Sequence, residues 1–175
     1  MNIYFLQLTY NIKHEPQIFY ILNFYKRKLF FLEQNNQNIK YYLKIEINNI
    51  DEFIKVGISH CRRIEIYTNG ALRKPDWYKH IAETYGKKVS IQFCVDGASH
   101  DTNWKYREGV DWNRAMDNMK SYFQNGGKGR WEYLIFSWNW TEIPLANQIA
   151  KDMPCEIKFK WNRRKWGLIS PSDTN

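Results

Sequence analysis

Closely spaced cysteines are missing from this sequence. Its three cysteines, Cys61, Cys94 and Cys155, lie more than thirty residues apart and form no CxxC pair. This spacing excludes a small disulfide scaffold and a self-contained zinc or iron–sulfur site. Long apolar runs are missing too, because charged residues interrupt the most apolar stretch, residues 18–32, and about 20 apolar residues are needed to span a bilayer. We therefore expect a protein of the reducing cytoplasm with no membrane partner.

Glycine is absent from residues 1–48, which contain a single proline, Pro16. The segment is rich in Asn, Ile, Tyr, Phe, Leu and Lys, and its apolar residues cluster without a clean period of 2 or 3.6. Only weak strand or helix is predicted there. We therefore expect three parts: an atypical segment at 1–48 outside the domain's original architecture, a domain at 49–168, and a polar tail at 169–175.

Acidic residues are outnumbered, with 18 Asp and Glu against 26 Lys and Arg, which gives a net charge of +8. Such a charge permits contact with nucleic acid or anionic ligands, and it is also typical of a solvated surface. Basic and aromatic residues alternate in 158–161 (KFKW), and three basic residues precede a tryptophan in 163–166 (RRKW), a pattern that suits phosphate contact and base stacking. A nucleic-acid-binding domain is therefore an alternative, although no known recognition motif is present.

Residues 63–97 have the order strand, helix, strand. Ile64, Ile66 and Tyr67 are strand formers, and residues 68–70 (TNG) form a turn. Pro75 suits a first helical turn, and apolar residues follow at helical spacing. The apolar run 89–95 is a second strand. This order predicts a right-handed βαβ unit with parallel strands.

The same alternation continues along the chain. Helices are predicted from Asp51, from Asp111 as N-cap, and over 141–153 with Leu145, Ile149 and Ala150 facing inward. A polar loop is predicted at 98–110, and further strands at 131–138 and 155–161. Cys94 lies within an apolar strand and is expected to pack as a small hydrophobic residue. Strands alternating with helices predict an α/β fold with a parallel sheet, and the strands are too few to close a full barrel.

Several short motifs in sequence order carry a family resemblance: TNGALRKPDW, a strand ending in VDG, DTNWKYREGVDWNRAMDN, and GGKGRWEYLIF followed by an Asn. Together they resemble the middle and later part of a radical S-adenosylmethionine (radical SAM) core domain over about residues 51–166. The resemblance implies a truncated, parallel-stranded partial (β/α) barrel with ligands at the C-terminal ends of its strands, where parallel barrels place their sites. It also implies S-adenosylmethionine and a [4Fe–4S] cluster as cofactors, and cleavage to a 5′-deoxyadenosyl radical.

The resemblance assigns cofactor-binding positions at the strand ends. Asp96 and Gly97 fall where the family commonly meets the cofactor's ribose, and Arg107 is suited to pair with a carboxylate. Asn139 follows the next strand, flanked by tryptophans where family members tend to show a His-Asn-Glu sequence. From the residues alone, Asn69-Gly70 and Asp96-Gly97 are equally turn dipeptides, and Arg107 a surface ion-pair partner. The implied cofactor-binding residues are Asn69, Asp96, Gly97, Arg107 and Asn139.

The cluster loop of the family, CxxxCxxC, occurs nowhere in the chain, and the glycine-rich GGE-like segment is also missing. No metal ligand is therefore predicted, and catalysis by this chain alone is not expected. The chain fits a truncated or decayed member, or one part of a split protein whose companion chain supplies the missing strands and cysteines. A third interpretation is an interaction module that completes a partner's barrel through an exposed sheet edge. The substrate, a small molecule or a peptide, is not specified.

Overall fold

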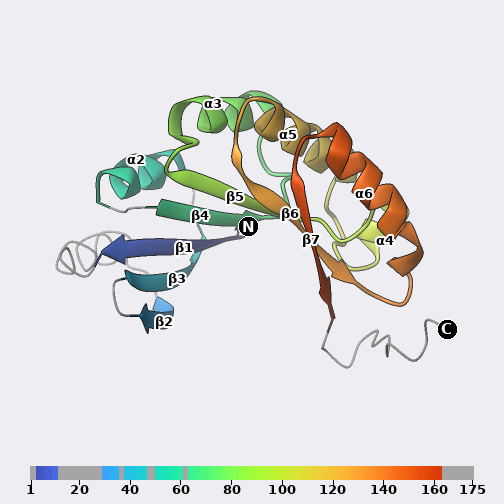
Figure 1. Cartoon of the computed structure of the whole chain (residues 1–175), viewed down its shortest axis with the longest axis horizontal. Helices are drawn as coiled ribbons and strands as arrows, with labels where there is room; N and C mark the ends of the chain where they lie inside the picture. The colour runs from blue at the N-terminus through green and yellow to red at the C-terminus, as the bar shows by residue number, and fades with distance from the viewer. Residues whose placement is uncertain (1–2, 12–28, 36–37, 47–49, 61–62, 163–175) are drawn as a thin grey trace.

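A computed structural model describes residues 3–11, 29–35, 38–46, 50–60 and 63–162. Its strands form one mixed sheet in the order β2-β3-β1-β4-β5-β6-β7 (Figure 1). The strands are β1 (Ile3–Asn11), β2 (Leu29–Asn35), β3 (Asn38–Glu46), β4 (Arg63–Thr68), β5 (Val89–Cys94), β6 (Lys128–Ile135) and β7 (Glu156–Trp161). The helices are α2 (Ile50–His60), α3 (Pro75–Tyr85), α4 (His100–Trp104), α5 (Trp112–Gln124), the 3₁₀ turn η2 (Trp140–Glu142) and α6 (Ile143–Asp152).

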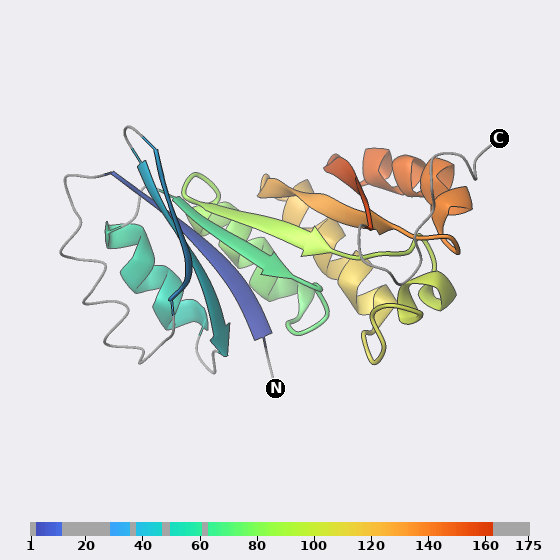
Figure 2. The same ribbon diagram turned by 90° about the horizontal axis from the view of Figure 1, so that it is seen from below.

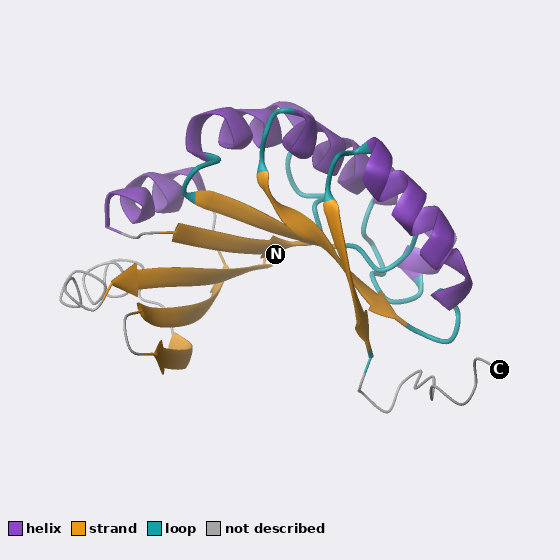
Figure 3. Cartoon of the chain, viewed as in Figure 1, coloured by secondary structure: helices purple, strands orange, loops and turns teal. Residues whose placement is uncertain are grey.

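Strands β4 to β7 are parallel, and each is joined to the next by a helical crossover. The sheet curves, and helices α2, α3, α5 and α6 cover its convex side (Figure 3). The described strands do not close into a barrel, since β2 and β7 stand at the two ends of the order. The predicted α/β fold with a parallel sheet is confirmed.

Alternation along the parallel strands separates an apolar face from a polar one. Ile66 on β4, Phe93 on β5 and Trp131 on β6 are all buried toward the helices. The ring of Phe93 lies 5.4 Å from that of Tyr78 and 5.7 Å from that of Tyr122, which come from α3 and α5. Burial of each such side chain contributes roughly 2–3 kcal/mol. The alternate side chains, such as Tyr67, Cys94 and Glu132, face the concave side of the sheet.

The helix boundaries follow local chemistry. Asp111 caps α5, because its side chain accepts a hydrogen bond from the backbone nitrogen of Arg114 at 3.0 Å. Helix α3 begins at Pro75, as predicted. The polar segment 98–110 is not only loop, since it contains α4, which is capped by the Ser99 side chain. Ser99 is a residue type that favours the N-cap position, and this preference could have predicted the start of the helix.

Two predicted segments need correction. The strand predicted at 131–138 is β6, which begins at Lys128 and ends at Ile135. The helix predicted at 141–153 starts with η2 and becomes α-helical only at Ile143. Leu145 was expected to face inward, but it is 50% exposed, and the buried stripe is formed by Ala146 and Ala150. Small side chains on that stripe let α6 lie close to the sheet.

Strands β1 to β3 extend the sheet beyond its parallel part (Figure 2). Strand β1 pairs antiparallel with both β3 and β4, so the change from antiparallel to parallel pairing falls at β4. The domain boundary expected near residue 48 stays a prediction. The edge of β4 that does not pair with β5 pairs with β1.

Cys61, the basic run at 163–166 and the tail at 169–175 lie outside the described residues. No helix within the described ranges is long and apolar enough to cross a membrane.

Candidate functional site

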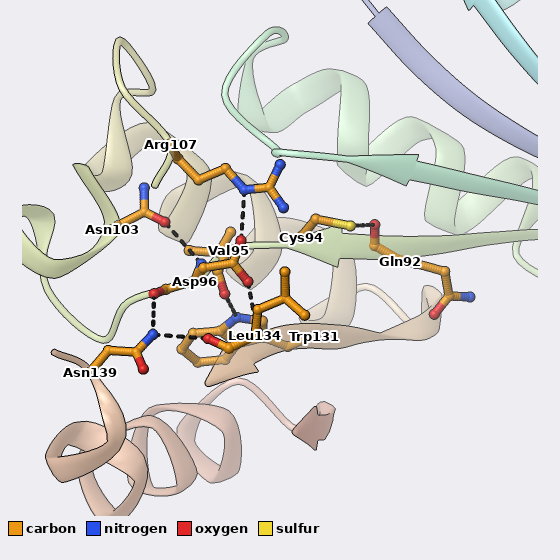
Figure 4. A network of polar contacts seen from close by, with 9 residues as sticks. All are labelled: Gln92, Cys94, Val95, Asp96, Asn103, Arg107, Trp131, Leu134 and Asn139. Carbon is orange, nitrogen blue, oxygen red and sulfur yellow. Dashed lines mark hydrogen bonds and ion pairs between the residues drawn. The ribbon is translucent and has the colours of Figure 1, made fainter. Parts of the chain in front are cut away.

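Asp96 is the centre of a polar network at the carboxyl end of β5 (Figure 4). Its Oδ1 accepts from the backbone nitrogen of Leu134 at 2.7 Å, and its Oδ2 accepts from Arg107 Nε at 2.7 Å. The Asp96 backbone nitrogen donates to Asn103 Oδ1 at 2.9 Å. One buried aspartate therefore joins the end of β5, strand β6 and the segment that contains α4.

Asn139 completes this network from the loop after β6. Its Nδ2 donates to the carbonyl oxygens of Asp96 at 2.7 Å and Leu134 at 2.9 Å, and its Oδ1 accepts from the Phe136 nitrogen at 2.7 Å. Asn139 is fully buried. Since both N–H groups of the amide are used, the side chain fixes the backbone ends of β5 and β6 relative to each other.

Gly97 allows a close approach in the same network. A Cβ atom there would overlap the backbone nitrogen of Asn103, and the Gly97 carbonyl accepts from Trp112 Nε1 at 3.0 Å. Asn69 lies apart, after β4, where its Oδ1 accepts from the Ala71 nitrogen at 3.1 Å and stabilises its own turn. The structure thus brings together four of the five predicted residues, and contact of any of them with a cofactor stays a prediction.

A cavity of about 140 Å³ lies beside the network. The sequence did not predict most of the residues that line this cavity. Residues two apart on a strand face the same side of a sheet, and this alternation was the one pattern that could have identified them. It is lined by Tyr67, Cys94, Asp96, Arg107, Glu132, Tyr133, Leu134 and Lys160.

The basic and aromatic residues of β7 separate onto its two faces. Lys160 lines the cavity, whereas the Phe159 ring packs 5.4 Å from that of Tyr133 in the core. Phe159 is therefore not available to stack on a base. The nucleic-acid alternative stays a prediction that depends on Trp161, which is 50% exposed, and on residues 163–166, outside the described ranges.

Glu132 forms an ion cluster on the concave face. Arg130 Nε donates to its Oε1 at 2.6 Å, and Lys160 Nζ contacts its Oε2. Burial favours the neutral acid, but the hydrogen bonds from Lys160 and Arg130 outweigh it and hold the pKa of Glu132 below its usual value. At Asp96 burial dominates and raises the pKa, although Arg107 and the Leu134 N–H favour the charged form.

Two neutral groups flank these ions. Burial raises the pKa of the Cys94 thiol to about 11, and burial together with Glu65 raises the pKa of Tyr67 to about 12. Because the thiolate is the reactive form of cysteine, this raised pKa favours the less reactive thiol form of Cys94 at neutral pH. It is partly buried, and its sulfur faces the Gln92 carbonyl at 3.8 Å.

The two carboxylates predict opposite effects of pH on stability. Glu132 has a lowered pKa, so its contribution is present above its unfolded pKa, near 4.5, and is lost as pH falls through the folded pKa. Asp96 has a raised pKa, so its contribution is present below about 3.8 and is lost as pH rises through the folded pKa. Urea unfolding between about pH 6 and 3 should show that Glu132→Gln loses less stability than the wild type as the pH falls, because only the opposite effect of Asp96 remains. An unchanged slope would show that Glu132 is not held ionised by its partners.

The described residues do not fit an iron–sulfur cluster. Strand register places Cys94 beside Glu132 and Glu132 beside Lys158, whereas Cys155 lies directly before β7, three residues before Lys158. At roughly 3.3 Å per residue and 4.8 Å per strand, the two cysteines are about 14 Å apart, too far to share a cluster. No group of three metal-ligating side chains occurs in the part of the chain that the structure describes.

Comparison with known proteins gives a structural likeness only. No family model matches the chain, and no curated protein matches it. SuiB of Streptococcus suis, in a crystal structure bound to S-adenosylmethionine, is similar with a TM-score of 0.56 and 15% identity over 69% of this chain and 29% of that chain. The structure of anSMEcpe with bound AdoMet is similar with a TM-score of 0.53 and 12% identity over 71% of this chain and 38% of that one.

This chain therefore spans less than two fifths of either neighbour. At such low identity the likeness shows the fold alone. That fold is an α/β partial barrel, as the sequence predicted, and both neighbouring structures contain S-adenosylmethionine.

Proposed function

We propose that this chain is a radical SAM-like partial barrel that binds S-adenosylmethionine at the carboxyl ends of its parallel strands. The observation that carries the proposal is the fold likeness, over about 70% of the chain, to two structures that each contain this cofactor. The Asp96 network and the cavity beside it lie at the edge where parallel barrels bind their ligands.

Two unpaired buried atoms support the proposal, one on α4 at this edge and one within β5. Asn103 Nδ2 and Gln92 Oε1 are buried and have no hydrogen-bond partner among the described residues. A buried polar group without a partner costs about 1–3 kcal/mol, a cost that a ligand would remove. Arg107 has terminal nitrogens that point away from Asp96 (Figure 4). We assign Asn103 and Arg107 to cofactor binding, with Asp96 and Asn139 holding the backbone in place.

S-adenosylmethionine supplies an electrophilic sulfonium centre and an adenosyl group when it is bound. The residues of this chain would orient it: Arg107 offers N–H donors held in place by Asp96, and Gly97 lets the backbone after β5 pass close to the α4 segment. Because the described cysteines do not fit a cluster, no radical step is assigned to this chain alone. We propose that any radical step would need a companion chain that carries the missing cysteines.

Calorimetric titration of the full chain with S-adenosylmethionine tests the proposal. We expect saturable binding that Arg107→Gln weakens roughly ten- to hundredfold, since a charged hydrogen bond contributes about 1.5–3 kcal/mol. Arg114→Gln is the matched control, because Arg114 is an exposed residue of α5 outside the network. Thermal melting of each variant verifies folding. Absence of binding to the folded wild type would overturn the proposal.

A further inference from the structure

A second and larger cavity, of about 720 Å³, lies at the opposite edge of the parallel strands from the Asp96 network. Its walls are the last turns of α2 and α3 and the turns that lead into β5 and β6. We propose that this cavity is a docking site for an acidic segment of a partner protein, one that carries an apolar side chain between its carboxylates. The inference goes beyond the proposed function, because it concerns the amino ends of the strands and no cofactor.

Two glycines bring the amino ends of β5 and β6 together. Gly86 directly follows α3, and Gly126 lies two residues after α5. A Cβ atom on Gly86 would overlap the Ala82 carbonyl oxygen and lie 3.5 Å from the Gly126 carbonyl oxygen. Gly126 has a φ of +82°, a conformation that other residues rarely adopt. The two turns therefore pack side by side, and the lysines next to each of them line one cavity.

Lysines dominate the charge of this lining. Lys87, Lys88 and Lys128 belong to it, against a single acidic residue, Glu83. Glu83 already faces Lys79, outside the lining, at 4.0 Å. Lys87 and Lys128 are exposed, and neither forms an ion pair within the described ranges. The cavity therefore presents uncompensated positive charge, to which an acidic partner is complementary.

The third lysine and its surroundings give the cavity an apolar wall. Lys88 Nζ donates to the Ile58 carbonyl oxygen at 2.8 Å and so caps the last turn of α2. Its hydrocarbon stem is held along the wall in this position. Ile58 and Tyr85 are half-buried and pack on the core, and Ala82 is buried. An apolar side chain of the partner therefore finds contact between the exposed ammonium groups.

The polar groups of the lining favour a polypeptide over a nucleic acid or a small ligand. Last turns of helices present carbonyl oxygens without intrahelical partners, which accept from peptide N–H groups but repel phosphates. Tyr85 already packs at a right angle to the His80 ring, 5.9 Å away, so it is not free to stack on a base. The described lining contains no buried side-chain atom that lacks a partner, so it has none of the unpaired fixed groups that would orient a small ligand.

The probe is the amidated peptide EELEE, labelled with fluorescein at its amino end, and fluorescence anisotropy measures its binding to the full chain at about 0.1 M ionic strength. We expect saturable binding. Lys87→Gln combined with Lys128→Gln should weaken it roughly tenfold, since a partly screened ion pair contributes a factor of about 2 to 5. Replacing the leucine of the peptide with serine should weaken binding by a similar factor, because the apolar contact is lost.

Lys74→Gln combined with Lys105→Gln is the matched control. Both lysines are exposed and lie at the carboxyl edge of the sheet. Helix α3 separates Lys74 from the cavity by roughly 16 Å, beyond the Debye length of about 10 Å. This pair of substitutions removes the same charge and should change the affinity for the peptide less than about twofold. Thermal melting verifies the folding of each variant.

Chemical shifts locate the peptide on the ¹⁵N-labelled chain, where we expect the amides of Gly86, Lys88 and Gly126 to move. Four results would overturn the inference: no saturable binding to the folded wild type, equal binding of QQLQQ or EESEE, equal weakening by the two pairs of substitutions, or shifts confined to other residues. Displacement of the peptide by a lower concentration of oligouridylate would assign the lysines to nucleic acid and overturn it as well.

S-adenosylmethionine separates this inference from the proposed function. The variant that lacks Lys87 and Lys128 should bind the cofactor as the wild type does, because the cavity and the Asp96 network lie at opposite edges of the sheet. Peptide binding by a wild type that does not bind S-adenosylmethionine would support the docking site while contradicting the proposed function. The reverse result would contradict the docking site alone.

Discussion

Replacing Asn139 with alanine is expected to lower the free energy of unfolding by about 3–5 kcal/mol, because it leaves three buried backbone groups unpaired at about 1–3 kcal/mol each. The groups are the carbonyls of Asp96 and Leu134 and the N–H of Phe136. In thermal unfolding the loss corresponds to roughly 10 °C.

Two further variants make this result specific. Ser137→Ala changes an exposed neighbour of the same loop and should leave stability within about 0.5 kcal/mol of wild type. Asn139→Asp keeps an acceptor for Phe136 but turns a carboxylate toward two carbonyl oxygens, so it should not restore stability. A mild effect of Asn139→Ala, below about 1 kcal/mol, would mean that water replaces the amide.

Gly97→Ala is expected to cost about 3 kcal/mol, because the new methyl group meets the backbone of Asn103 and overpacking of this kind must move the chain. The α4 segment carries Arg107, so its displacement should also break the ion pair with Asp96. Urea unfolding measures the first effect. Loss of the distinctive Arg107 Nε–H signal in the NMR spectrum measures the second.

Gly109→Ala is the control for this variant. Gly109 has a φ of +77°, yet a Cβ atom there meets nothing within 4 Å. Its cost should therefore be limited to backbone strain, about 1 kcal/mol, with the Arg107 signal retained. If both variants lose the same stability, the close approach of Gly97 to Asn103 is not what fixes this loop.

Much of the parallel half was predictable from local sequence. Ile64 and Ile66 alternate, Pro75 begins a helix, and Asp111 caps one, and each of these signals acts within a few residues. Local signals identify elements and their order, and the order strand, helix, strand itself implies parallel pairing. The antiparallel pairing of β1 had no such signal, because residues 1–48 show no regular period.

The concave face was less predictable, since it depends on contacts between distant residues. Glu132 and Lys160 read as ordinary charged residues until β6 and β7 are placed side by side. Leu145 seemed a core residue by hydrophobicity, yet the helix presents Ala146 to the sheet instead. Which face of the helix packs on the sheet depends on how closely the two elements approach, and a single sequence carries little information on that distance. Asn139 was found through the family resemblance, while the backbone groups it binds became visible only in the structure.

The position of β1 bears on how the chain folds during synthesis. Strand β1 leaves the ribosome well before one of its two partners, β4, which begins at Arg63. At about 5–20 residues per second, the edge of β1 that faces β4 waits several seconds for its partner, and unpaired strand edges are sites of aggregation. The β1–β3 pairing joins residues that are closer in sequence than those of the β1–β4 pairing. It protects the edge of β1 that faces away from β4 during this interval. Nascent chains that end before β4 should therefore bind chaperones more strongly than chains that extend past α3.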